Sequence, residues 1–200
     1  MEELPEKTEI TLRVTLSDDE RALYETLRKR AADGLEAGAI TSFEALAEVT
    51  KLRRAVCHPK LVDESLPFAS SKSAAFLELV SDLMSGGHRT LVFSQFTSHL
   101  ALIRKELEER GIDYLYLDGA TSAKDRKALV EAFQTGTAPL FLISLKAGGT
   151  GLNLTAADYV VHLDPWWNPA VEDQASDRAY RIGQKNPVTI YRLIAEDTIE

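Results

Sequence analysis

The sequence predicts an α/β protein in which a parallel β-sheet carries helices on both faces and is preceded by a smaller helical segment. After residue 67, short apolar runs typical of buried strands alternate with helical patterns. Before residue 60 the pattern is mainly helical. Between these parts, HPKLVDESLPFASS (58–71) contains two prolines and three serines, which interrupt both patterns. We therefore predict two domains, residues 1–66 and residues 67–200.

The N-terminal part is predicted to form a short strand followed by a helical hairpin. The segment ITLRVTL (10–16) alternates apolar and polar residues as a half-buried strand does. Ser17 and Thr41 each precede a glutamate by three residues, which is the spacing of a capping box at a helix N-terminus. The second helix has to end before Pro59, because the residue before a proline disfavours helical geometry.

The C-terminal part is predicted to alternate strands with helices. The expected strands are 90–94, 114–117, 139–144, 158–163 and 188–194, and the expected helices include 71–84, 99–110 and 125–133. A further helix is expected to begin at Asn168-Pro169 and to end at Gly183. In such sheets ligands bind at the carboxyl ends of the strands, so the residues that follow each strand are the candidate site residues.

Composition and charge exclude several classes of protein. No apolar run approaches the roughly 18–20 residues of a membrane span, so no membrane partner is expected. The formal net charge of −8 argues against nucleic-acid binding by bulk electrostatics. Local basic patches remain compatible with that charge, and Lys51, Arg53 and Arg54 form either such a patch or a solvated helix face.

Cysteine and histidine usage indicates a reduced compartment and no resident metal. Cys57 is the single cysteine, which excludes an internal disulfide. The four histidines are scattered without the spacing of metal ligands. The polar, acidic N-terminus MEELPEKTEI does not resemble a signal peptide.

The segment NPAVEDQASDRAYRIGQ (168–184) carries the most chemical information. On a continuous helix, its polar side chains would fall on one stripe, at i, i+3, i+4 and i+7: Gln174, Asp177, Arg178 and Arg181. One interpretation is a solvated face with an Asp–Arg pair. The other is a pair of guanidiniums that stabilise charge on a triphosphate during phosphoryl transfer.

The segment SLKAGGTGLNL (144–154) follows a strand directly. Its glycines, Gly148, Gly149 and Gly151, form either an anion-binding nest or a tight connection. Ser144 and Lys146 contact phosphate in the first case and are plain surface in the second. The segment is not a Walker A loop, because G-x-x-x-x-G-K-[ST] does not occur in the chain.

Other strand ends carry aromatic and uncharged polar residues. The two tryptophans of HLDPWWNP (162–169) are either core residues or a wedge against a partner lobe or nucleic acid. Ser94, Gln95 and Thr121 offer uncharged donors of the kind that bind backbone phosphates without reading bases.

Taken in order, LVFSQF, YLDGAT, SLKAGGTGLNLTAADYVVHLDPWWNP and DQASDRAYRIGQ resemble the second RecA-like lobe of SWI/SNF-type DNA translocases, in helicase superfamily two. LRRAVCHPKL resembles the helical insertion that precedes this lobe, so the resemblance covers nearly the whole chain. The RIGQ ending is specific for this family. Tyr180 departs from the usual histidine, with little expected consequence.

The resemblance implies a role for each matching residue. Arg178 and Arg181 are similar to the family's arginine fingers, and Gln174 to their helper. Gly149, Gly151 and Asp177 are similar to residues of the nucleotide cleft. The residues that match the family's DNA track, together with the basic pair of the helical insertion, are Ser94, Gln95, Asp118, Gly119, Thr121, Ser144, Lys146, Trp167, Arg53 and Arg54.

The chain has neither a Walker A lysine nor an acidic Walker B box. The resemblance therefore implies ATP with Mg²⁺ held mainly by a first RecA-like lobe of the same parent chain, with this chain inactive as an ATPase alone. It implies double-stranded DNA as a partner, and a protein displaced from DNA is a further candidate. The expected location is the bacterial cytoplasm and nucleoid or the eukaryotic nucleus. Two alternatives remain open: a non-catalytic docking or regulatory lobe, and an RNA helicase lobe.

Overall fold

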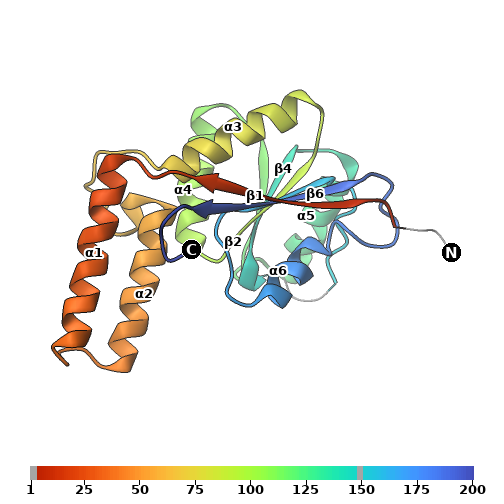
Figure 1. Cartoon of the computed structure of the whole chain (residues 1–200). Coiled ribbons are helices and arrows are strands. Elements are labelled where there is room, and N and C mark those ends of the chain that lie inside the picture. Colours follow the sequence, from red (N-terminus) through yellow and green to blue (C-terminus); the bar gives the residue numbers. More distant parts are fainter. Residues whose placement is uncertain (1–3, 148–150) are drawn as a thin grey trace. The chain divides into compact units, whose positions relative to one another are not determined.

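The computed structural model describes residues 4–147 and 151–200 (Figure 1). They group into two compact units, which we call the sheet unit (residues 1–12 and 78–193) and the helical unit (residues 13–77 and 194–200). The division falls within strand β1 (Lys7–Val14), helix α3 (Ser71–Ser85) and strand β6 (Val188–Ala195). The predicted domain boundary at residues 66 and 67 remains a prediction.

The sheet contains six strands in the order β1-β6-β5-β2-β4-β3. Besides β1 and β6, the sheet contains β2 (Thr90–Ser94), β3 (Tyr114–Leu117), β4 (Leu140–Ser144) and β5 (Tyr159–His162). β1 and β3 are the edge strands. β2 pairs in parallel with β4 and β5, β3 with β4, and β5 with β6. At the start of β6, the Val188 amide donates to the Glu6 carbonyl at 2.9 Å, which ties β1 alongside it. The parallel sheet predicted from the sequence is confirmed.

The predicted strands agree closely with the observed ones. The predictions for 90–94 and 114–117 are confirmed at both ends, and the next three strands differ by one residue at most at either end. The first strand differs more, because it runs from Lys7 to Val14 instead of over residues 10–16. It belongs to the six-stranded sheet.

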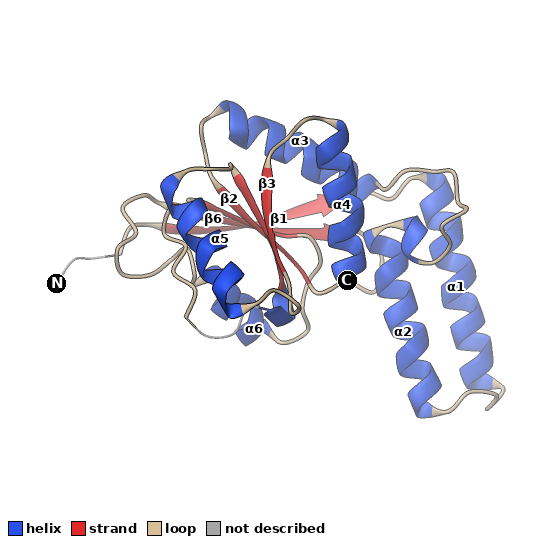
Figure 2. Ribbon diagram, turned by 180° about the vertical axis from the view of Figure 1, so that it is seen from behind, coloured by secondary structure: helices blue, strands red, loops and turns tan. Residues whose placement is uncertain are grey.

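Helices cover both faces of the sheet. The crossover from β2 to β3 runs across the sheet in the opposite direction to those from β3 to β4 and from β5 to β6. Because such crossovers are right-handed, α4 (Thr97–Glu109) lies on one face, and α5 (Ala123–Thr135) and α6 (Pro169–Ser176) lie on the other. Figures 1 and 2 show this arrangement, with α3 on the side of α4.

The core of the sheet unit is built from strands without a polar face. Every residue of β2 and β4 is buried, as expected for parallel strands covered on both sides. His162, at the end of β5, is fully buried in this core. Its ring stacks on Phe93 at 5.5 Å, and its Nε2 lies 3.0 Å from the Ser176 hydroxyl. Burial, and then the positive charge of Arg192, lower the pKa of His162 to about 3.

The helical unit contains the predicted hairpin, α1 (Asp18–Glu36) and α2 (Ser42–Cys57), whose helices lie side by side in Figures 1 and 2. Both capping boxes are confirmed: Ser17 and Thr41 each accept from the amide of the glutamate three residues on, at 3.3 Å. α2 ends before Pro59, and a short 3-10 helix, η1 (Pro59–Leu61), follows. A buried ion pair between Lys72 and Glu200 (2.6 Å) lies in this unit.

Among the helices of residues 4–147 and 151–200, none has both the length and the apolar character needed to cross a membrane.

Lowering the pH from 7 to 5 is expected to reduce the free energy of unfolding by about 2 kcal/mol through His162. The folded protein holds this ring neutral, whereas the unfolded chain protonates it near pH 6.5. The stabilisation is therefore complete above pH 6.5 and decreases as the pH falls toward the folded-state pKa of about 3. Urea denaturation at both pH values tests this. His162→Gln should show a pH dependence smaller by that amount, and an unchanged pH dependence would contradict the assignment.

Candidate functional site

The register of the sheet aligns the carboxyl ends of its strands. Ser94 of β2 lies opposite Ser144 of β4, and Phe93 of β2 lies opposite His162 of β5. Leu117, the last residue of β3, lies opposite Ile143. The residues that follow β5, β2, β4 and β3 therefore emerge side by side along one edge. The structure thus brings together the predicted track residues of three strands.

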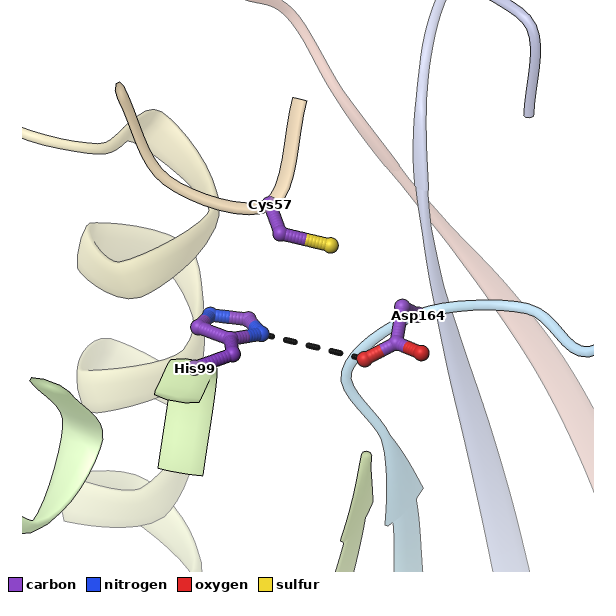
Figure 3. A group of neighbouring side chains, drawn as sticks. All are labelled: Cys57, His99 and Asp164. Carbon is purple, nitrogen blue, oxygen red and sulfur yellow. Dashed lines mark ion pairs between the residues drawn. The ribbon is translucent and has the colours of Figure 1, made fainter. Parts of the chain in front are cut away.

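The end of β2 is held by a carboxylate that the sequence analysis did not single out. Asp164 is 1% exposed and accepts hydrogen bonds from the Ser94 hydroxyl and, at 3.1 Å, from the Gln95 amide. Its Oδ1 also lies 3.7 Å from Nδ1 of His99, an ion pair drawn as the dashed line in Figure 3. An acidic residue directly after an apolar strand was the available sequence signal for Asp164.

The turn after β3 is organised by Asp118. Its carboxylate accepts from the Ala120 amide at 2.8 Å and from the Tyr116 hydroxyl at 2.9 Å, and its own amide donates to the Thr121 hydroxyl. The Ala120 amide is the main cause of the lowered pKa of Asp118. Burial, and then the bond to Asp118, raise the pKa of Tyr116 to about 12. Gly119 lies at the exposed tip of this turn, where an added Cβ would meet nothing within 4 Å.

The end of β4 leads into the glycine-rich segment. Ser144 is buried, and Lys146 is exposed in the short 3-10 helix η2 (Leu145–Ala147). Gly149, a predicted cleft residue, lies outside the described residues. Gly151 is exposed and has a φ of 110°, a conformation that favours glycine.

The helix predicted from Asn168 to Gly183 is shorter than expected. Asn168 caps it as predicted, accepting from the Ala170 amide at 3.1 Å, but α6 ends at Ser176. The prediction that this helix continues to Gly183 was therefore wrong. Turns replace its second half, and the expected polar stripe does not form: Arg178 is buried, whereas Ile182 is 81% exposed.

Competing hydrogen bonds explain why the helix does not continue toward Gly183. In a continuing helix, the carbonyls of Arg178 and Ala179 would accept from the amides of residues 182 and 183. Instead, the Arg178 carbonyl accepts from the Leu154 amide at 2.9 Å. The Ala179 carbonyl accepts from Nε2 of Gln184 at 2.8 Å. Tertiary partners thus replace the helical ones and shape a turn over residues 177–183.

The two predicted arginine fingers have different environments. Arg178 is 6% exposed, with its guanidinium 5.3 Å from the centre of the Phe93 ring. Burial, and then the charge of Arg126, lower the pKa of Arg178 to about 10, which leaves it charged at neutral pH. Arg181 is exposed, and its Nη1 donates to the Leu152 carbonyl at 3.3 Å. The turn is therefore attached to the segment that follows Gly151.

The remaining predicted residues divide between surface and core. Gln174 and Asp177 are exposed. Trp166 packs against the core, and its amide donates to Glu172 at 3.2 Å, whereas Trp167 is 57% exposed. The core interpretation thus holds for Trp166, whereas the interpretation of Trp167 as a wedge remains a prediction. The basic pair, Arg53 and Arg54, lies in α2 of the helical unit and is partly buried.

Gln184 is a structural residue of the turn that the sequence analysis left without a role. It is 7% exposed, donates from Nε2 to the carbonyls of Ala157 and Ala179, both at 2.8 Å, and accepts from the Asn186 amide at 3.0 Å. Its side chain binds the Ala179 carbonyl and its amide binds the Arg181 carbonyl, so the residue closes the turn that carries Arg178 and Arg181.

We expect Gln184→Glu to lower the free energy of unfolding by about 2–4 kcal/mol, because it removes the donor from two buried carbonyls. Denaturant titration of this variant is the measurement. Gln174→Glu makes the same chemical change at an exposed position and should cost no more than about 0.5 kcal/mol. Similar losses in both variants would show that the hydrogen bonds of Gln184 contribute little.

Comparison with known proteins identifies the family. Residues 71–183, more than half of the chain, match the helicase conserved C-terminal domain family. The chain belongs to this family. This helicase C-terminal lobe is also 40% identical over 202 residues to an uncharacterized ATP-dependent helicase of Mycoplasma pneumoniae, covering 100% of the chain and 20% of that protein.

Two further comparisons confirm the predicted resemblance to SWI/SNF-type proteins. The lobe is 36% identical over 211 residues to the human SWI/SNF-related matrix-associated actin-dependent regulator of chromatin subfamily A member 1, covering 98% of the chain and 20% of that protein. It is similar to the SWI2/SNF2 ATPase core of Sulfolobus solfataricus in complex with dsDNA, with a TM-score of 0.81, 29% identity and coverage of 96% of this chain and 41% of that one. The RecA-like fold is thereby confirmed. The chain spans about a fifth of the length of these curated relatives.

Proposed function

We propose that this lobe is one half of an ATP-driven motor that moves along double-stranded DNA and that it supplies arginine fingers to the active site. One observation carries the proposal. The turn bearing Arg178 and Arg181 is hydrogen-bonded to the segment after Gly151, through the Arg178 carbonyl and the Arg181 side chain. Two guanidiniums and a glycine-containing segment thus form one element, which suits a polyphosphate ligand.

The donor set of this element suits phosphate better than metal. Guanidinium groups and the Gln174 amide donate to phosphate oxygens, whereas Mg²⁺ prefers carboxylate oxygens and water. We therefore assign Mg²⁺ and most of the ATP contacts to a first RecA-like lobe of the parent protein. ATP bound there would supply the phosphoryl group, and this chain alone would be inactive as an ATPase.

The two arginines act by stabilising charge. Arg181, exposed at the surface, reaches the γ-phosphate when the lobes close. Arg178 is largely desolvated, and a charge in a dry environment interacts more strongly with developing negative charge than one in water. Neither residue is assigned a proton-transfer role, because a guanidinium group donates hydrogen bonds and has no acceptor for a proton.

The aligned strand ends form the proposed DNA track. The uncharged donor Gln95, with Lys146, contacts backbone phosphates and reads no bases, whereas Thr121 donates its hydroxyl proton to Asp118 at 3.4 Å and supports the neighbouring turn. The exposed Trp167 lies on the connection after β5. Because the relatives include a bacterial helicase and a human regulator of chromatin, the proposed setting is nucleoid or nuclear DNA, with a DNA-bound protein as a candidate substrate.

Replacing either finger in the full-length protein is expected to lower DNA-stimulated ATP turnover by about 10³–10⁵-fold. Arg178→Ala and Arg181→Ala should both show the loss, measured at saturating DNA. Arg110→Ala is the matched control, since Arg110 is also exposed and also donates to a carbonyl, that of Glu106, at 2.9 Å. Near-normal turnover in both finger variants would instead favour a non-catalytic docking lobe.

Double-stranded DNA is expected to stimulate the ATPase of the full-length protein more than single-stranded DNA or RNA of equal length does. The reason is that a track of backbone contacts along a duplex engages fully only when the duplex is present. Turnover is measured as a function of each nucleic acid at fixed ATP. Strongest stimulation by RNA would identify an RNA helicase lobe and refute the proposal.

A further inference from the structure

The buried carboxylate of Asp164 is not needed for any of the chemistry assigned so far. A buried charge is unfavourable unless hydrogen bonds satisfy it. Three of its contacts in the sheet unit are the Ser94 hydroxyl, the Gln95 amide at 3.1 Å, and Nδ1 of His99 at 3.7 Å. All three belong to the end of β2 and the first turn of α4. The carboxylate therefore joins the β5–α6 connection to the β2–α4 loop and to α4. Figure 3 shows its pairing with His99 of α4.

Several of the hydrogen bonds that hold the β2–α4 loop lead to this carboxylate. Helix α4 begins at Phe96 without a side-chain capping bond. The Phe96 amide donates instead to the Ser94 hydroxyl at 3.1 Å, and that hydroxyl donates to Asp164. Gln95 adds one more bond to the same connection, from Nε2 to the Pro165 carbonyl at 3.3 Å. The position of the loop thus depends on a chain of bonds that ends at Asp164.

These bonds also determine which side chain of the β2–α4 loop can still donate a hydrogen bond to a phosphate. A serine hydroxyl has a single proton, and that of Ser94 goes to Asp164, a charged acceptor that lies closer than the Phe96 carbonyl at 3.4 Å. The Gln95 side chain has two amide protons, and one bond to Pro165 leaves the other available. Gln95 is therefore the donor of this loop toward a phosphate, and Ser94 supports it.

We propose that Asp164 is a positioning residue for DNA binding: it fixes the β2–α4 loop so that Gln95 faces the phosphate backbone. This inference rests on the proposed function of the lobe. Asp164 itself makes no contact with DNA and acts through Ser94 and Gln95.

The chain contains a matched control at the opposite end of the same strand. Asp158 precedes β5, as Asp164 follows it. It accepts from the Arg89 amide, just before β2, at 3.1 Å, and lies 2.6 Å from Nδ1 of His88. Both aspartates thus hold one backbone amide and one histidine ring, but Asp158 does so at the amino edge of the sheet, away from the proposed track.

The experiment compares Asp164→Asn with Asp158→Asn in the full-length protein, using duplex DNA as the probe. Asp164→Asn is expected to raise the DNA concentration for half-maximal ATPase stimulation about tenfold, the effect of one lost charge-assisted bond, while kcat at saturating DNA stays within about threefold. Asp158→Asn should leave both values within about twofold, even where thermal unfolding shows that it is destabilised. Amide exchange should accelerate at Gln95 in the first variant and at Arg89 in the second.

The outcomes distinguish a failure of the positioning role from a failure of the proposed function. Equal shifts in half-saturation for the two variants, or no shift for Asp164→Asn, would overturn the positioning role while leaving the motor function intact. An ATPase that duplex DNA does not stimulate in the wild type would overturn the proposed function and, with it, this inference. If Asp164→Asn does not fold, Asp164→Glu keeps the charge but displaces the carboxylate, and the same shift is expected.

Discussion

The register between β2 and β5 is the constraint on which the proposed site depends. Both strands are apolar and buried, so the hydrophobic pattern alone specifies their register weakly. Two carboxylates fix the register instead. Asp158 binds the Arg89 amide at one end, and Asp164 binds the Gln95 amide at the other, each pair 69 residues apart in sequence. Because the two separations are equal, both bonds select the same alignment of the strands.

A second constraint is the early end of α6. A continuous helix would have placed Arg178 and Arg181 on one solvated face. The turn instead buries one guanidinium beside Phe93 and leaves the other exposed. Burial of Arg178 costs stability, as its lowered pKa indicates, and the buried hydrogen bonds of Gln184 offset part of that cost. The turn that carries both proposed finger residues is thus stabilised by a residue that has no role in the proposed chemistry.

Most of the fold could be predicted from the sequence because its signals are local. The apolar runs at 90–94 and 114–117 are bounded by polar residues, and the capping boxes at Ser17 and Thr41 lie within four residues. The end of α6 could not be predicted in this way. The turn that takes the place of a helix up to Gly183 depends on the Leu154 amide and the Gln184 side chain, and a periodic pattern does not report such partners. Asp164 was missed for the same reason, since its partners lie on another strand.

The acidic character of the chain is consistent with a proposed DNA track in which binding depends on the fixed positions of a few donors. With a net charge of −8, bulk attraction to phosphate is absent, and the proposed contacts are few and mainly neutral. Neutral donors bind well only when they are held in place beforehand, because ordering them on binding would cost entropy. Asp118 and Asp164 meet that need: each directs its charge at backbone amides and hydroxyls of its own edge of the sheet. Acidic residues at a proposed DNA-binding edge are thereby explained, because their carboxylates hold the loops and leave contact with the phosphates to the neighbouring donors.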